Sequence, residues 1–337
     1  MQAILSAIAM IFGKLMMFMY DTIGFHNYAL SLVLFTIVYK VVLMPLSAKQ
    51  IKSTQKMQEI QPELQRLQER YKNDKEKLNE MTMKFYREKG YNPAGGCLPM
   101  LIQFPIIIAL FYVIRMPMTY MLELPAKAVG EMVIASVDKG EFSKETLRSK
   151  NYDAIVGNPV DIYNAYNTSD GYFEIKLIDS YKKHPVIVDQ NPTLTPDQKA
   201  VLKNFNITML GIFNLGTQPS LDPGTIIKDP GKYIPPLILL LIAVVTQFFA
   251  TKLMMPAPPK DKSGKTANAG CANKGMLYFS PLMTLWFGTI MPSGLAFYWI
   301  LQSILSYAQQ KVMNKIYKKD KEESQVAKID SKGSKNG

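Results

Sequence analysis

The sequence has few of the side chains on which most enzyme chemistry depends. Its 337 residues include two cysteines, Cys97 and Cys271, and two histidines, His26 and His184. The cysteines form neither a CxxC pair nor a zinc-type spacing, so the sequence indicates no disulfide framework and no metal site. The histidines lie far apart in polar turns, where a surface role is the simpler interpretation. Cys97 is interpreted as a small buried residue rather than a nucleophile.

The long apolar runs also lack acidic residues and histidine well inside them. Proton relays, zinc proteases and aspartyl proteases need such groups, so the sequence argues against all three classes. A serine–lysine protease would need a nucleophile near Lys40, and Ser31 lies nine residues away on the same predicted helix. We therefore expect no enzyme activity and no cofactor.

A nucleotide site is not indicated either. Gly264-Lys265-Thr266 resembles the end of a P-loop, but the loop requires a glycine five residues before Gly264, and Pro259 occupies that position.

The most informative stretch is the apolar run 27–46, which carries Lys40 well inside it. A helix needs about 20 residues to cross a bilayer, and this run is long enough. A charge within such a helix costs at least about 2.5 kcal/mol, so it marks a candidate functional site. Thr36, four residues earlier, shares the face of Lys40. The alternative is that the lysine snorkels to the interface along its apolar stem.

The apolar pattern predicts an all-α polytopic membrane protein with a five-helix transmembrane core. The first 26 residues are amphipathic, with Ile4, Ile11 and Phe18 at helical spacing, and we expect them to form an interfacial helix rather than a span. The predicted spans are 27–46, 96–116, 233–254, 276–291 and 294–313. The last two are joined by the short turn 291–294, which makes an antiparallel hairpin.

A charged segment follows the first span at 47–92. Met57, Ile60 and Leu64 begin one apolar seam and Phe85 ends another, so we expect an antiparallel helical hairpin. Eleven Lys or Arg residues lie between Lys49 and Lys89, which places this hairpin in the cytoplasm by the positive-inside rule. The alternative is a solvated hairpin that has no binding partner.

Three further segments complete the chain. Residues 117–232 carry fourteen Asp or Glu against twelve Lys or Arg and are predicted to form a mostly helical extracytoplasmic insert. Thr195 opens one of its helices with a capping box. Residues 255–275 are predicted to be a cytoplasmic linker, and 314–337 a basic cytoplasmic tail, part of a disordered arm that begins at Lys311. These predictions place the N-terminus outside and the C-terminus in the cytoplasm.

Polar side chains inside the spans indicate a wet, cationic cavity. Lys40, Gln103 and Gln247 lie within predicted spans, and Thr36 and Tyr298 can join them. Such a cavity could hold polar peptide segments that lipid rejects. For Gln103 the alternative is a simple bridge between helices. For Trp299 the alternative is packing or an interfacial anchor.

Two long motifs give a specific resemblance. Residues 92–99, NPAGGCLP, are followed by Gln103-Phe104-Pro105, and residues 292–299 read PSGLAFYW. Together with the order of spans from about residue 15 to 313, they resemble the YidC family of membrane-protein insertases, part of the YidC/Oxa/Alb superfamily. The insert at 117–205 is outside the resemblance. The N-terminal helix, with no large domain before the first span, is similar to the Gram-positive form.

The resemblance implies a mechanism. Family members hold a hydrophilic groove in the inner half of the bilayer, where a cation attracts acidic residues of the substrate. Lys40 occupies the place of that cation, with Thr36 beside it. Gln247 and Trp299 match groove positions, and Tyr298 matches a substrate-contact position. The implied partners are nascent membrane proteins and the lipid bilayer of the bacterial plasma membrane. The basic tail resembles ribosome-docking arms, and participation of a Sec translocon stays open.

One departure concerns the groove cation, which is commonly arginine in the family. Lysine keeps the charge but loses the bidentate fork, so we expect weaker and more pH-sensitive capture of carboxylates. Two other classes of function remain open on the residues alone. One is a small-molecule or ion transporter, although no internal repeat is found. The other is an assembly receptor that binds clients without inserting them.

Overall fold

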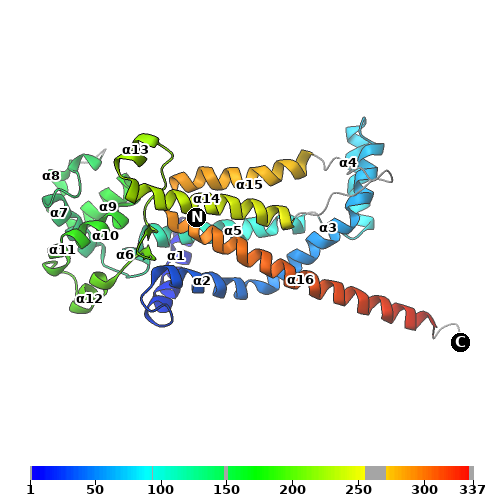
Figure 1. Ribbon diagram of the computed structural model, residues 1–337, viewed down its shortest axis with the longest axis horizontal. Helices are drawn as coiled ribbons and strands as arrows, with labels where there is room; N and C mark the ends of the chain where they lie inside the picture. Colours follow the sequence, from blue (N-terminus) through cyan, green and yellow to red (C-terminus); the bar gives the residue numbers. More distant parts are fainter. Residues whose placement is uncertain (1, 93, 148–150, 255–270, 334–337) are drawn as a thin grey trace. The chain divides into compact units, whose positions relative to one another are not determined.

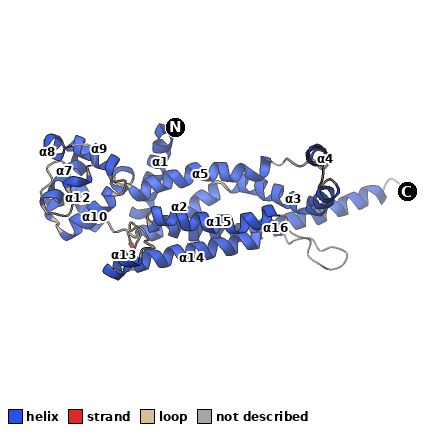
Figure 2. Cartoon of the chain, turned by 90° about the horizontal axis from the view of Figure 1, so that it is seen from above, coloured by secondary structure: helices blue, strands red, loops and turns tan. Residues whose placement is uncertain are grey.

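The computed structural model describes residues 2–92, 94–147, 151–254 and 271–333. Within these ranges, side chains are described except at 2, 94–103, 271–274, 276 and 318–333. The predicted all-α class is confirmed, since the described chain is helical apart from loops and one two-stranded ladder (Figures 1 and 2). The predicted P-loop-like triplet and most of the 255–275 linker lie outside the described residues.

The chain divides into two compact units. Unit 1 comprises Met1–Thr36, Pro105–Ala243 and Leu285–Trp299, and unit 2 comprises Ile37–Phe104, Val244–Thr284 and Ile300–Gly337. The boundary falls inside five helices, namely α2 (Tyr28–Val42), α5 (Ala94–Arg115), α14 (Pro230–Met254), α15 (Cys271–Ile290) and α16 (Ser293–Gly333).

Several helices of the described chain have the length and composition of membrane spans. In the described part of the chain, α14 meets both criteria, as does Ala3–Asp21 of α1 (Gln2–Asp21). The bent pair of α2 and α3 (Met44–Arg70) counts as a third, while Phe104–Arg115 and Leu277–Ile290 are shorter apolar helices. Length and composition therefore do not decide whether α1 spans the membrane or lies at its surface. The five-helix transmembrane core stays a prediction.

The first predicted span is broken near its end. α2 stops at Val42 and α3 starts at Met44, with a bend of 66° between them. Pro45 is the physical reason, because it has no N–H to donate and its ring clashes with the carbonyl four residues earlier. Pro45 is tolerated in the first turn of α3, where that N–H has no helical partner.

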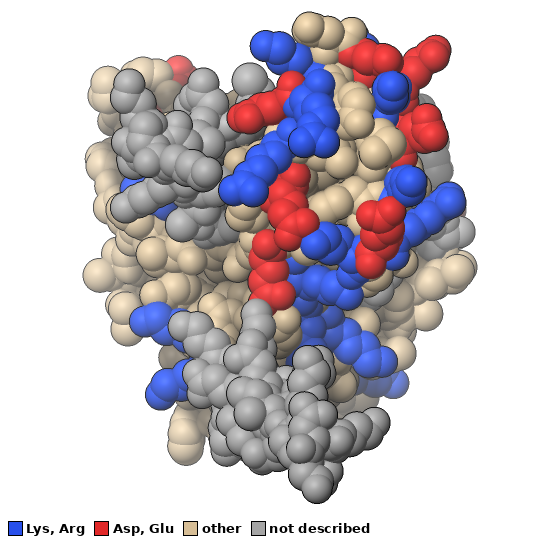
Figure 3. Space-filling model, turned by 90° about the vertical axis from the view of Figure 1, so that its right-hand side faces the viewer, with Lys and Arg blue, Asp and Glu red and all other residues tan. Residues whose placement is uncertain are grey.

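Unit 2 contains a helical pair formed by α3 and α4 (Lys75–Glu88). Ile60, Leu64 and Phe85 form its small buried cluster, and the partly buried Met57, Leu67, Tyr86 and Tyr91 pack against them. Lys89 also pairs with Glu63 at 2.6 Å. The face in Figure 3 carries blue and red side chains close together, in agreement with a charged, solvated pair.

The insert in unit 1 consists of short helices around an apolar core, gathered in green in Figure 1. Its elements are α6 (Pro117–Tyr120), α7 (Ala126–Asp138), η1 (Lys144–Thr146), α8 (Tyr152–Ile155), α9 (Pro159–Ser169), α10 (Phe173–Lys183), α11 (Val186–Asp189), α12 (Pro196–Asn204), β1 (Thr208–Met209), β2 (Phe213–Asn214) and α13 (Pro223–Lys228). The strands are antiparallel, with Thr208 opposite Asn214. α7 and α9 pack closely because Gly130 has no side chain: a Cβ there would lie 1.8 Å from the Pro159 carbonyl oxygen.

The predicted disorder after Lys311 is wrong over most of the tail. α16 continues as one helix to Gly333. Residues 311–333 include seven lysines and two glutamates, which favour helix, and no proline. It extends a helix that is already formed, so it needs no costly new nucleus.

Candidate functional site

Lys40 lies in the last turn of α2, in unit 2, and its side chain is half-buried. A cation is favourable there, because the last carbonyl groups of a helix carry partial negative charge. The Nζ atom donates a hydrogen bond to the Ser306 hydroxyl of α16 at 2.8 Å. Among the residues that the structure describes, no carboxylate pairs with this ammonium. An ammonium has three donors, so Lys40 retains capacity for a negatively charged ligand.

Gln247 forms a second polar contact in unit 2. Its Nε2 donates to the Ser280 hydroxyl of α15 at 2.9 Å, and its Oε1 accepts from the Ser303 hydroxyl of α16 at 2.7 Å. The amide thus joins α14, α15 and α16 through their side chains. Side-chain hydrogen bonds of this kind between membrane helices contribute only about 0.6 kcal/mol on average.

A polar stripe on α16 connects these contacts. Gln302, Ser306, Gln310 and Asn314 recur every four residues and so share one face of the helix. The Tyr39 hydroxyl donates to Gln302, and the Gln55 amide of α3 donates to Asn314. We use the name polar cluster for Tyr39, Lys40, Gln55, Gln247, Ser280, Gln302, Ser303, Ser306, Gln310 and Asn314.

The predicted site residues fall into three groups. Lys40 and Gln247 belong to the polar cluster. Thr36, Tyr298 and Trp299 lie in unit 1, where Thr36 is buried and donates to its own helix at the Leu32 carbonyl. Tyr298 is fully buried and Trp299 half-buried. Gln103 is in α5, but its side chain lies outside the described residues, so its role stays a prediction.

Sequence reasoning missed the hydroxyl and amide partners on α15 and α16. The signal was present as the four-residue recurrence from Gln302 to Asn314. This signal is easily overlooked because Ser and Gln are common near the ends of spans, and because the segment 294–313 is mostly apolar. Ser280 had no comparable signal, since it lies alone in an apolar stretch.

A buried carboxyl group occurs in unit 1, outside the predicted spans. Glu174 of α10 is fully buried and accepts hydrogen bonds from the Met118 and Thr119 backbone N–H groups at 2.8 and 3.2 Å. The Thr119 hydroxyl donates to the other carboxylate oxygen of Glu174 at 2.5 Å. Burial raises the pKa of Glu174 to about 7, although the bonds from Thr119 and Met118 and the charge of Arg115 act against this shift. This contact fixes α10 to the start of α6.

The described part of the chain is therefore an apolar helical protein with a small cationic and amide-lined cluster. A family model described as 60Kd inner membrane protein matches residues 18–322. The chain belongs to this 60Kd inner membrane protein family.

Similar proteins are named membrane protein insertase YidC. The relative from Fusobacterium nucleatum subsp. nucleatum is 49% identical over 89 residues, which are 26% of this chain and 43% of that protein. The relative from Clostridium perfringens is 51% identical over 87 residues, 26% of this chain and 37% of that protein. The relative from Leptospira interrogans is 26% identical over 303 residues, 90% of this chain and 33% of that protein. The chain thus matches less than half the length of each relative, and the predicted resemblance is confirmed.

Proposed function

We propose that the protein is a membrane-protein insertase and chaperone that receives polar tails of nascent membrane proteins and releases their apolar helices into lipid. The observation that carries this proposal is the Lys40 ammonium, which lies in an apolar helix and bonds a neutral hydroxyl, with no carboxylate paired to it among the described residues. The partial negative charge at the end of α2 offsets only part of the cost of placing a cation among apolar helices, so a function for that charge is the default expectation.

The role of Lys40 in the proposal is to attract acidic residues of the client. A carboxylate that approaches Lys40 exchanges its hydration for a charge-assisted hydrogen bond, which is about twice as strong as a neutral one. Ser306 holds the ammonium in place until the client arrives. The family resemblance adds that this exchange takes place in a hydrophilic groove in the inner half of the bilayer.

The amide and hydroxyl groups of the polar cluster serve the client backbone. An extended peptide in lipid would leave N–H and C=O groups unpaired at a cost of several kcal/mol each. Gln247 and Ser303 can exchange their mutual bond for bonds to the client at little net cost. Thr36, Gln103, Tyr298 and Trp299 are proposed as further groove positions by family resemblance.

The driving force is transfer of the client's apolar helix into lipid, with no nucleotide and no covalent step. Burial of apolar surface contributes roughly 25 cal/mol per Å², so a spanning segment of about 20 residues outweighs the passage of a short polar tail. The names of the relatives support this function, since they are called insertases.

The proposed location is the bacterial plasma membrane, with the N-terminus outside and the C-terminus in the cytoplasm. The lysine-rich α3–α4 pair and tail support this orientation by the positive-inside rule. The α3–α4 pair then meets nascent clients first. A ribosome bound at the tail, and a Sec translocon, are further proposed partners.

Reconstitution of the purified protein in nucleotide-free liposomes tests the proposal. A single-spanning client with an acidic tail is added, and protection of the tail from external protease is measured. We expect protection with the wild-type protein and with Lys40→Arg, but not with empty liposomes. Binding without protection would identify a receptor, and solute flux without protection a transporter; either result would contradict the proposal.

A further inference from the structure

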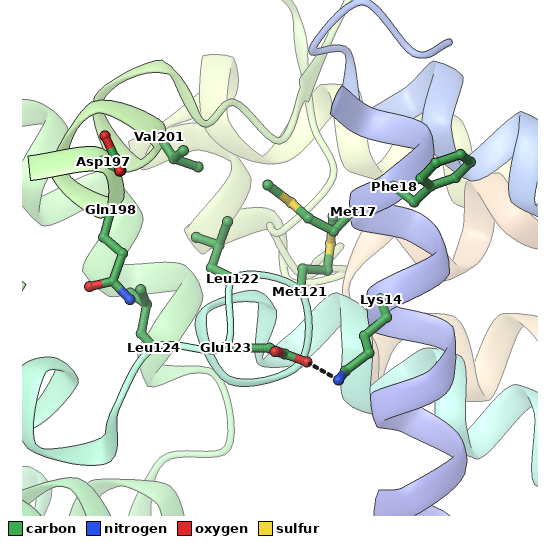
Figure 4. A pocket seen from close by; sticks show the side chains of 10 residues that line it. All are labelled: Lys14, Met17, Phe18, Met121, Leu122, Glu123, Leu124, Asp197, Gln198 and Val201. Atoms are coloured by element: carbon green, nitrogen blue, oxygen red, sulfur yellow. Dashed lines mark ion pairs between the residues drawn. The ribbon is translucent and has the colours of Figure 1, made fainter. Parts of the chain in front are cut away.

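An apolar pocket of about 330 Å³ lies in unit 1. Three segments line it: α1, the turn that follows α6, and α12 (Figure 4). Met17 from α1, Leu122 from the turn and Val201 from α12 approach the same space in Figure 4. Its volume is at the lower end of the range for small-molecule sites, and its mainly apolar lining is typical of them.

α1 forms one wall because it docks tightly against the start of the insert. Ala9 and Met16 are fully buried, and a Cβ at Gly13 would lie 1.9 Å from the Tyr120 carbonyl oxygen. Figure 2 shows α1 running across the direction of α5. This arrangement suits a helix that lies along a membrane surface rather than one that spans it.

The opposite face of α1 is apolar and exposed. Ile4, Ile11 and Phe18 are seven residues apart and are 66%, 64% and 60% exposed. Phe18 also lines the pocket. The exposed apolar stripe therefore leads along α1 to the pocket, and on a membrane surface the material in contact with that stripe is lipid.

The pocket lining carries one cation, Lys14, and two carboxylates, Glu123 and Asp197. The Lys14 ammonium and the Glu123 carboxylate form an ion pair at 3.0 Å, drawn as a dashed line in Figure 4. Both side chains are largely exposed, at 63% and 44%, so the pair contributes little to stability and exchanges partners easily. A zwitterionic headgroup, with a phosphate and an ammonium, matches this pair of charges.

We propose that this pocket binds one acyl chain of a bilayer phospholipid, with the headgroup phosphate at Lys14 and the headgroup ammonium at Glu123. Met17 and Met121 form adaptable walls that suit an irregular hydrocarbon chain. The bound lipid fixes the end of α1 to the insert. The inference requires α1 to lie at the membrane surface, and it is independent of the proposed insertase activity.

Photolabelling in liposomes tests this site. The full-length protein is reconstituted with phosphatidylethanolamine that carries a diazirine in its acyl chain, illuminated, and mapped by peptide mass spectrometry. We expect labelling of the segments around Met17 and Met121 to exceed that around Leu241 and Val245, which are exposed apolar residues of α14. Leu122→Trp fills the pocket and is expected to lower pocket labelling about tenfold, as for a loss of about 1.4 kcal/mol in binding.

Ile11→Trp is the matched control, because Ile11 is on the exposed stripe but does not line the pocket. It should leave pocket labelling unchanged. Val201→Phe provides a second filling variant if Leu122→Trp fails to fold, and Lys14→Gln should lower labelling several-fold by removing the phosphate partner. Pocket labelling no higher than at α14, or unchanged in both filling variants, would overturn the proposal. Labelling of the pocket by a photoreactive apolar client, in place of labelling by the lipid, would also overturn the proposal.

Discussion

The two units use their polar groups in different ways. In unit 1, large side chains such as Tyr166, Phe173 and Leu177 are fully buried, and polar groups join elements within that core. The buried Ser180 hydroxyl donates to Ser136 at 2.8 Å, for example. In unit 2, the described side chains form a small apolar cluster around Leu64, while the polar cluster connects the helices to one another.

This difference suggests a division of roles. A well-packed core gives a rigid framework, because each large side chain that is removed leaves a cavity. Hydrogen bonds between membrane helices are weak and exchangeable by comparison. We therefore expect unit 1 to set stability and the polar cluster of unit 2 to capture the client's acidic tail, and the predictions below test that separation.

The largest expected effect concerns the core of unit 1. Phe173→Ala should lower the free energy of unfolding by about 3–5 kcal/mol, because it leaves a cavity in a region where Phe173 is fully buried. Denaturant unfolding in detergent measures the loss. Val160→Ala is the control, since Val160 is 38% exposed, and it should cost much less. Equal losses in the two variants would contradict a core-based framework.

A pH effect is expected from Glu174. Its pKa is raised in the folded state from the usual 4.5 to about 7, so the folded protein binds this proton more tightly than the unfolded chain does. The resulting stabilisation is complete below pH 4.5 and is lost as pH rises to about 7. It amounts to roughly 3 kcal/mol at most.

Glu174→Gln isolates this effect, because the amide keeps an acceptor for the backbone N–H groups but does not titrate. The variant should lose most of the stability difference between pH 4.5 and pH 7, measured by thermal unfolding. The exposed Asp138→Asn serves as the control and should retain it. A pH dependence identical in wild type and Glu174→Gln would exclude this carboxyl as its source.

In unit 2, Lys40→Ala should impair insertion without a matching loss of stability. Hydrogen bonds to charged groups contribute about 1.5–3 kcal/mol, so insertion of acidic-tailed clients should fall about tenfold or more. Complementation of an insertase-depleted strain measures this. Lys40→Arg should retain activity, and clients with neutral tails should be little affected. If Lys40→Ala inserted acidic-tailed clients as well as the wild-type protein does, the charge of Lys40 would have no role in the mechanism.

The smallest effect compares matched hydroxyl groups in the two units. Ser303→Ala removes the bond to Gln247 and should cost about 0.6 kcal/mol of stability, the average for membrane helices. Ser180→Ala removes the bond to Ser136 inside the core of unit 1 and should cost about 1–3 kcal/mol. The same unfolding assay serves both variants. A larger loss for Ser303→Ala would reverse the comparison between the units.

Local signals in the sequence predict much of the fold. The apolar runs predict the all-α class, and Thr195 with Gln198 predicts a capping box that forms with both of its hydrogen bonds. Pro45 is the local signal for the bend at Leu43, but the apolar run continues to Leu46, so the predicted span extends past the break. The helical tail was missed because a high density of lysine suggests disorder, whereas helix propensity and a preformed α16 favour helix.

The candidate site is only partly predictable. Lys40 and Gln247 are conspicuous because they are polar residues in apolar runs. Their partners Ser306, Ser280 and Ser303 are ordinary residues whose role depends on which helices pack together, and a single sequence does not specify that packing. The division into two units inside five helices has no local signal either.

Site-specific crosslinking to a stalled nascent chain tests the central claim most directly. A photoreactive residue at position 306, beside Lys40, is compared with one at Val42, which is 67% exposed on the same end of α2. We predict that position 306 crosslinks the polar tail of an acidic client, whereas position 42 crosslinks only lipid or the client's apolar segment. A polar tail that crosslinks equally at both positions, or at neither, would contradict the account.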